Sequence, residues 1–283
     1  MTCLFEKISS EIQHGRYKIA QNMIHTLPQD FKPMGLYYGS RIQELTGHFE
    51  RSLETADKLL EMVQKGNNEH QLGIVAKAYA LWRLARFEEA LVLLNSNIED
   101  VSSSEETFSH LYNVRGLIFW KLGDNRSALQ DFQRAVNLRK SSNLMGHLSY
   151  SMNNIGNTYL NMGNMDSALD YYSESLKLRK ELKINPGIAA SYNSFGRYYE
   201  KTGNKEMALE NYTKSLEIWS NVGNNQFIAK SYRFLGTFYI KVEKYESGLE
   251  YLRKANDLFS TIPNITDAYL TSQILKKVES LIP

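Results

Sequence analysis

One segment, Met152–Tyr172, reads MNNIGNTYLNMGNMDSALDYY, and a second, Tyr192–Tyr212, reads YNSFGRYYEKTGNKEMALENY. The second begins 40 positions after the first, and both carry glycine at their fifth position and alanine at their seventeenth. The same step continues in both directions, so the chain has an internal repeat of 40 residues. The matching positions are Gly116, Gly156, Gly196 and Gly236; Phe119, Tyr159, Tyr199 and Tyr239; Ala128, Ala168, Ala208 and Gly248; and Phe132, Tyr172, Tyr212 and Leu252.

These spacings resemble the tetratricopeptide repeat, in which large-x-x-Leu-Gly-x-x-Tyr on one helix is followed by Ala-x-x-x-Phe on the next. Small residues at the glycine and alanine positions let two helix axes approach closely, while the aromatic side chains fill the space between layers. Gly163 and Asn164 fit the turn inside a pair, because glycine accepts a positive φ and asparagine caps the following helix. The resemblance implies an all-α, right-handed α-solenoid of about seven helical hairpins with a C-terminal capping helix.

The pattern divides the chain into three parts of one continuous solenoid. Residues 1–104 carry degenerate repeat units, and residues 105–262 carry units that conform well to the 40-residue pattern. Residues 263–283 are predicted to form the capping helix, with Thr266 or Asp267 as its N-cap.

Composition and charge argue against several classes of function. The chain has 33 Lys and Arg against 31 Asp and Glu, a formal net charge of +2, which argues against nucleic-acid binding driven by bulk phosphate attraction. The single cysteine, Cys3, leaves no internal disulfide and favours a reducing compartment, the cytoplasm. No stretch approaches the roughly 18 apolar residues that span a bilayer, so membrane insertion and secretion are not expected.

No motif of a known catalytic or cofactor-binding type occurs in the sequence. The chain lacks a P-loop, a G-x-G-x-x-G fingerprint, a G-x-S-x-G elbow and an H-E-x-x-H motif. Its six histidines are 11 to 40 residues apart, so no two of them lie one helical turn apart. The adjacent acids Glu105 and Glu106 are interpreted as helix N-terminal residues that offset the helix dipole. The sequence therefore predicts no enzyme activity, no cofactor and no metal site.

The resemblance also implies a recognition surface, because in this family the first helix of each pair lines the concave face. The position three before the repeat glycine is Asn113, Asn153 and Asn193 in successive units, and then Arg233. A carboxamide both donates and accepts hydrogen bonds, so this row can bind the backbone of an extended peptide irrespective of its sequence. The row resembles those of kinesin light chains, spindle-orientation adaptors and peptide-pheromone receptors. The alternative is that these asparagines only solvate the groove.

Charged and aromatic residues extend the predicted surface. Basic residues outnumber acidic ones at the groove positions of the later units, which favours an acidic peptide, a carboxylate terminus or a phosphorylated segment. Nearer the N-terminus, aromatic side chains offer anchoring pockets, although Trp82 and Trp120 fit core packing equally well. The predicted peptide-binding groove comprises Asn113, Asn153, Asn193, Arg233, Asn157, Arg197, Lys230, Tyr79, Trp82 and Trp120.

The sequence thus predicts a cytoplasmic adaptor or scaffold that captures an extended, acidic segment of a partner protein. One alternative is a sensor in which a short signalling peptide closes the superhelix and alters its contact with an effector. Another is the regulatory subunit of an enzyme complex. A sensor compacts on binding its ligand whereas a passive clamp does not, and a regulatory subunit co-purifies with a catalytic chain.

Overall fold

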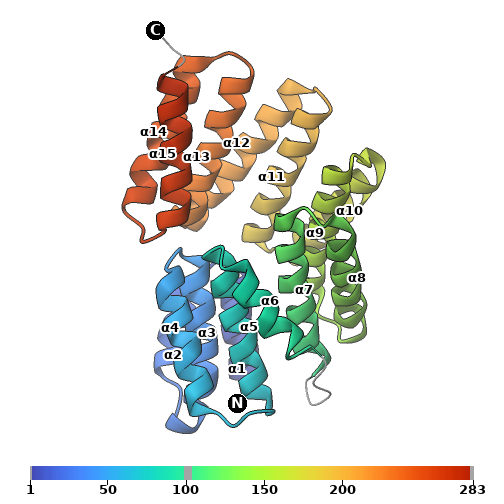
Figure 1. Cartoon of the computed structure of the whole chain (residues 1–283), viewed down its shortest axis with the longest axis vertical. Coiled ribbons are helices and arrows are strands. Elements are labelled where there is room, and N and C mark those ends of the chain that lie inside the picture. Colours follow the sequence, from blue (N-terminus) through green and yellow to red (C-terminus); the bar gives the residue numbers. More distant parts are fainter. Residues whose placement is uncertain (1, 99–103, 281–283) are drawn as a thin grey trace. The chain divides into compact units, whose positions relative to one another are not determined.

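The computed structural model describes residues 2–98 and 104–280, and every regular element in those ranges is helical. The helices form seven consecutive pairs and a final single helix, as the repeat predicts, and the short 3-10 helix η1 (Gln29–Phe31) precedes α3. No helix in the described ranges has the length and apolar character that crossing a bilayer requires. The helices are α1 (Thr2–Gln13), α2 (Tyr17–His25), α3 (Lys32–Leu45), α4 (Phe49–Met62), α5 (Asn68–Arg83), α6 (Phe87–Asn95), α7 (Glu105–Leu122), α8 (Asn125–Ser141), α9 (Met145–Met162), α10 (Met165–Glu181), α11 (Asn185–Lys201), α12 (Lys205–Val222), α13 (Asn225–Lys241), α14 (Tyr245–Ser260) and α15 (Ile265–Glu279) (Figure 1).

The chain divides into two compact units. Unit 1 comprises Met1–Leu45 and Phe49–Ile184, and unit 2 comprises Thr46–His48 and Asn185–Pro283. Unit 1 therefore holds α1 to α10 and unit 2 holds α11 to α15. Within each unit the two helices of a pair pack on each other, and the second helix of a pair packs on the first helix of the next pair. The boundary between the units falls between α10 and α11, inside the part of the sequence with the most regular repeats.

The repeat glycines allow the two helices of each pair to approach closely. A Cβ atom added to Gly156 on α9 would lie 2.7 Å from the ring of Tyr172 on α10. A Cβ atom added to Gly196 on α11 would lie 2.5 Å from the ring of Tyr212 on α12. Both tyrosines are almost fully buried, so each ring fills the space that the missing side chain leaves. The prediction that small residues at these positions let the two helices approach closely is therefore confirmed.

The turns inside the regular pairs also follow the sequence prediction. Gly163 ends α9 with a φ of +83°, in the left-handed region that glycine adopts without strain. The side chain of Asn164 then accepts a hydrogen bond from the backbone N–H of Ser167 at 3.1 Å and caps α10. Gly203 and Asn204 repeat this arrangement between α11 and α12.

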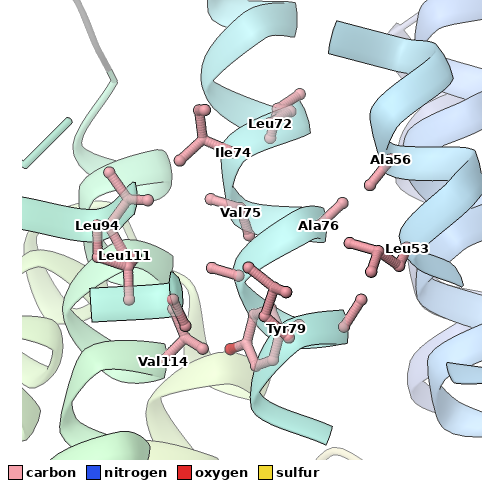
Figure 2. Close-up of a cluster of buried hydrophobic side chains, with 14 of the residues drawn as sticks. Leu53, Ala56, Leu72, Ile74, Val75, Ala76, Tyr79, Leu94, Leu111 and Val114 are labelled. Carbon is pink, nitrogen blue, oxygen red and sulfur yellow. The ribbon is translucent and has the colours of Figure 1, made fainter. Parts of the chain in front are cut away.

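The largest hydrophobic core lies in unit 1. Figure 2 shows that side chains of α5 reach in two directions, toward Leu53 and Ala56 on α4 and toward Leu111 and Val114 on α7. Val75 at the centre of α5 is fully buried, as are Leu111 and Val114. Helix α5 is apolar on most of its circumference because neighbouring helices cover it on more than one side.

Helix α15 follows α14, as predicted for the capping helix. Its N-cap, however, is not one of the two predicted residues. The cap is Asn264, whose side chain accepts a hydrogen bond from the Asp267 N–H at 3.1 Å. Thr266 and Asp267 instead lie in the first turn of the helix. Asn264 itself is fully buried, and asparagine at this position frees Asp267 to form other contacts.

Candidate peptide-binding surface

Asn113, the first residue of the predicted row, is a buried structural contact on α7, with 5% of its surface exposed. Its amide nitrogen donates to the Tyr79 hydroxyl at 3.0 Å. Its oxygen accepts hydrogen bonds from Arg139 Nη1 at 3.3 Å, Ser151 Oγ at 3.2 Å and Asn154 Nδ2 at 3.3 Å. Both ends of this carboxamide are engaged by the chain itself, and they connect α7 to α5, α8 and α9.

Asn153 occupies the equivalent place on α9 and is also buried, with 6% of its surface exposed. Its oxygen accepts a hydrogen bond from Arg179 Nη1 at 3.3 Å, just as Asn113 accepts one from Arg139. Each arginine also donates from Nε, at 3.2 Å, to a serine hydroxyl on the first helix of its own pair. Arg139 and Arg179 are each 1% exposed. Sequence reasoning missed both, and their spacing of 40 positions is the signal that would have identified them.

Arg139 is a buried cation whose hydrogen-bond partners are neutral groups. Its Nη1 atom also donates to the His147 carbonyl at 2.9 Å and to Ser151 Oγ at 2.6 Å. Among the residues that the structure describes, no carboxylate forms an ion pair with it. Burying a charge without a counter-ion is unfavourable unless its hydrogen bonds are satisfied, and the five N–H groups of a guanidinium can bond several helices at once. Arg139 therefore connects α8 to α7 and α9, while burial lowers its pKa to about 10.

Asn193 on α11 differs from the two earlier rungs. The residue 40 positions after Arg179 is Trp219, so this pair has no guanidinium at that position. Trp219 instead stacks on Phe227, with ring centroids 4.2 Å apart and an interplanar angle of 10°. Asn193 is half-buried, and its Oδ1 atom is buried without a hydrogen-bond partner. A buried acceptor without a donor is rare in folded proteins, and this one marks the rung whose oxygen the chain leaves open.

The last position of the row, Arg233 on α13, binds a carboxylate of the chain itself. Arg233 Nη2 lies 2.7 Å from Asp267 Oδ1 on α15, and Lys230 Nζ lies 3.1 Å from Asp267 Oδ2. Burial raises the pKa of the Asp267 carboxyl, but the charges of Lys230 and Arg233 and the hydrogen bonds from Asn264 and Arg233 outweigh burial. The result is a pKa well below its ordinary value of 3.8. Lys230 and Arg233, two of the basic groove residues that suggested an acidic partner, are thus neutralised by the capping helix.

Asn157 and Arg197 are the remaining polar residues of the predicted groove. The oxygen of Asn157 on α9 accepts a hydrogen bond from the hydroxyl of Tyr172 on α10, at 2.9 Å. It therefore supports the packing of the ring that faces Gly156. Arg197 lies on α11 and is half-buried, one helical turn after Asn193.

The three predicted aromatic anchors fall into two separate groups. Tyr79 and Trp82 lie on α5 with ring centroids 6.4 Å apart, and both join the large core of unit 1. The guanidinium of Arg41 lies 3.7 Å from the centre of the Tyr79 ring, and that of Arg83 lies 4.4 Å from the Trp82 ring. Trp120 packs against a different cluster, between α8 and α9. Cations thus lie over the rings of Tyr79 and Trp82, where a peptide side chain would otherwise pack.

A group of potential metal ligands lies in unit 1, where the sequence predicted none. Glu106, His110 and His147 each offer one ligand atom, and these three atoms lie within 4.8 Å of one another. The search for histidine pairs on one helix missed this group, because it joins a glutamate and a histidine on α7 to a histidine on α9. The available signal was the spacing of four between Glu106 and His110, which places both side chains on one helical face.

Comparisons with known proteins agree with the repeat geometry. A family model described as tetratricopeptide repeat matches residues 148–221, and another with the same description matches residues 109–142. No curated protein matches the chain by sequence. Among solved structures, a Rap protein complexed with competence and sporulation factor is 14% identical, with a TM-score of 0.73, covering 91% of this chain and 74% of that one.

Two further solved structures share the fold. NprR in complex with its cognate peptide NprX is 16% identical, with a TM-score of 0.72, covering 100% of this chain and 83% of that one. A putative kinesin light chain of Podosopora anserina is 12% identical, with a TM-score of 0.50, covering 70% of this chain and 99% of that one. The paired helices, the close-approach glycines and these matches show that residues 109–142 and 148–221 are tetratricopeptide repeats and that the chain shares the helical fold of these structures.

Proposed function

We propose that the chain is a cytoplasmic protein-interaction adaptor that binds an extended segment of a partner along the first helices of its repeats, without catalysis of its own. The observation that carries this proposal is Asn193, whose buried Oδ1 atom has no hydrogen-bond partner. Rotation of the half-buried Asn193 side chain would present this oxygen to a backbone N–H of an extended peptide, and the amide nitrogen would donate to a peptide carbonyl. The complexes of Rap with competence and sporulation factor and of NprR with its cognate peptide, both of which share the fold, support this class of function.

We propose further that the segment is acidic where it meets α13. Lys230 and Arg233 form charge-assisted contacts with Asp267, so this pair of cations is arranged to hold a carboxylate. An acidic residue of a bound peptide would compete with Asp267 for these cations. Binding at this end would then be coupled to the release of the first turn of α15.

Because Asn193 lacks the hydrogen bond that Asn153 accepts from an arginine, its role in peptide binding can be tested by mutation. Peptides selected by the full chain from a random-peptide phage library are titrated against the wild type and against Asn193→Ala. Loss of the Asn193 hydrogen bonds is expected to weaken binding by roughly tenfold with no loss of helicity. Asn221→Ala, which removes an exposed carboxamide from α12, is the matched control and retains wild-type affinity. Equal affinity of Asn193→Ala and the wild type would remove this residue from the mechanism.

Asn153→Ala is expected to behave differently from Asn193→Ala. It removes the acceptor of a hydrogen bond from the buried Arg179 guanidinium, so it lowers stability as well as any affinity. The acidic preference is tested separately, by replacing Asp and Glu in a selected peptide with Asn and Gln. If the acidic residues contribute, the neutral peptide binds more weakly and its binding depends less on salt. Unchanged binding would contradict the preference for an acidic segment.

A second candidate is a peptide sensor, which the division of the chain into two compact units favours. A peptide that contacts both units would alter their separation, whereas one that binds a single unit would not. Small-angle X-ray scattering of the full chain with and without a selected peptide distinguishes these cases. A decrease in the radius of gyration supports the sensor, and an unchanged value supports the passive adaptor.

A further inference from the structure

Three side chains with metal-ligand chemistry converge between α7 and α9, where His110 lies three positions before Asn113. Glu106 and His110 are one helical turn apart on α7, and His147 lies in the first turn of α9. Their ligand atoms all lie within 4.8 Å of one another. The two imidazole rings have centroids 4.7 Å apart and stand almost perpendicular, at 82°. Two imidazoles and one carboxylate form a ligand set that proteins use for zinc and related transition metals.

His110 lacks the hydrogen bonding that a buried imidazole normally has. The residue is 5% exposed, and its Nδ1 atom is buried without a hydrogen-bond partner. Buried polar atoms are nearly always paired, so an unpaired ring nitrogen beside two other ligand groups points to a missing partner. Burial holds the pKa of His110 well below 6.5, and burial together with the charge of Arg139 lowers the pKa of His147 to about 3.

The surrounding hydrogen bonds hold the two helices in place around the group. Arg139 on α8 donates to Ser109 Oγ on α7 at 3.2 Å and to the His147 carbonyl on α9 at 2.9 Å. Ser109 Oγ in turn donates to the Glu106 carbonyl at 2.7 Å. The backbones that carry all three candidate ligands are therefore connected through one guanidinium, which holds the helices in place while the side chains draw together around an ion.

The ligand atoms, more than the local charge, decide which ion the group accepts. Arg139 and Arg41 place positive charge near both imidazoles, and this opposes any cation. Glu106 is the one carboxylate of the group; although the residue is exposed, loss of water around its carboxyl raises its pKa above the ordinary value of 4.5, and the charge of Arg139 lowers it. Mg²⁺ and Ca²⁺ prefer sites built from oxygen ligands, whereas Zn²⁺ binds two nitrogens and one oxygen readily. Imidazole nitrogens favour the transition metal over the two hard cations.

We propose that Glu106, His110 and His147 form a Zn²⁺-type metal site that joins α7 to α9. Three protein ligands leave a fourth position for water, as in zinc sites that remain open. Gln13 on α1 approaches the group as well, with its Nε2 atom 3.2 Å from His147 Nε2. Because the Gln13 amide nitrogen is a donor, it competes with an ion for His147 Nε2, and the metal stabilises the contact of α7 with α9. Its three ligands lie in unit 1, whereas Asn193 lies in unit 2.

The test uses the full chain, freed of metal with a chelator and titrated with ZnCl₂ in a calorimeter. Saturable binding at one Zn²⁺ per chain and a higher unfolding temperature with Zn²⁺ are expected. Co²⁺ serves as the spectroscopic probe, because its visible absorption reports the ligands and geometry of the bound ion. Absence of saturable Zn²⁺ binding by the wild-type chain would overturn the proposal.

Variants separate a ligand role from a general effect of charge. Glu106→Gln lies at an exposed position and is expected to fold normally, and it should weaken Zn²⁺ binding roughly tenfold or more. Glu105→Gln removes the same charge from the same helix turn, but Glu105 accepts hydrogen bonds from Ser141 and Ser142, so Zn²⁺ binding should not change. His147→Gln should also lose the site and alter the Co²⁺ spectrum. Wild-type affinity in both Glu106→Gln and His147→Gln would show that Zn²⁺ binds elsewhere.

Discussion

At the scale of single residues, positions that are equivalent in sequence have acquired different roles. Asn113 and Asn153 accept hydrogen bonds from the buried Arg139 and Arg179. Asn193 has no such donor, because Trp219 occupies the equivalent position on the second helix of its pair. One substitution on the second helix of the pair thus changes an occupied carboxamide into one with an open acceptor. Whether the asparagine oxygen on the first helix is paired therefore depends on the residue that the second helix provides, because a buried acceptor is costly without a donor.

The repeat glycines offer a direct test at the residue scale. Gly156→Ala places a Cβ atom 2.7 Å from the buried ring of Tyr172, so we expect the free energy of unfolding to fall by about 1–2 kcal/mol. Gly39→Ala on α3 is the control, since a Cβ atom there meets nothing within 4 Å. It should stabilise the chain by about 0.5–1 kcal/mol, because alanine favours helix over glycine. Urea unfolding measures both, and similar shifts in the two variants would contradict the packing argument.

At the scale of the element, α15 docks through charge as well as through apolar contact. Val278 is buried and Ala268 packs beside Phe259 of α14, which accounts for part of the attachment. Asp267 adds contacts with Lys230 and Arg233 on α13. The half-buried carboxylate is stable there because two cations and the side chain of Asn264 satisfy it.

Asp267→Asn tests the electrostatic contribution of this helix. We expect a loss of about 2 kcal/mol at neutral pH, because the variant leaves two cations without their counter-ion. The pKa of Asp267 is lower in the folded state, so its contribution is present above 3.8, the ordinary value, and is lost as pH falls below it. The difference between variant and wild type should therefore shrink in acid. Asp257→Asn on the exposed side of α14 is the control, and equal stability of both variants would assign the docking to apolar contacts alone.

At the scale of the whole molecule, the two compact units are expected to unfold as separable parts. In a helical repeat array each layer contacts its neighbours, so cooperativity depends on how strongly successive layers are coupled. The three tryptophans report the units separately, because Trp82 and Trp120 belong to unit 1 and Trp219 belongs to unit 2.

The variant Trp82→Phe, Trp120→Phe retains Trp219 as its one tryptophan. We expect its fluorescence to change at a different urea concentration from the circular dichroism of the whole chain, since the latter follows both units. Trp219→Phe provides the complementary signal from unit 1. Coincident transitions in all these measurements would show that the chain unfolds as one cooperative body.

The sequence by itself determined the helical pairs, the turns at Gly163 and Gly203, and the close approach at the repeat glycines. These features depend on contacts between neighbouring helices, so a residue and its partner recur at fixed spacing. Only the tertiary structure decided which predicted groove residues are occupied. Arg139 reaches Asn113 across 26 positions and Asp267 reaches Arg233 across 34. The group of Glu106, His110 and His147 likewise joins two helices, and no short motif encodes the distance between helices that brings such ligands together.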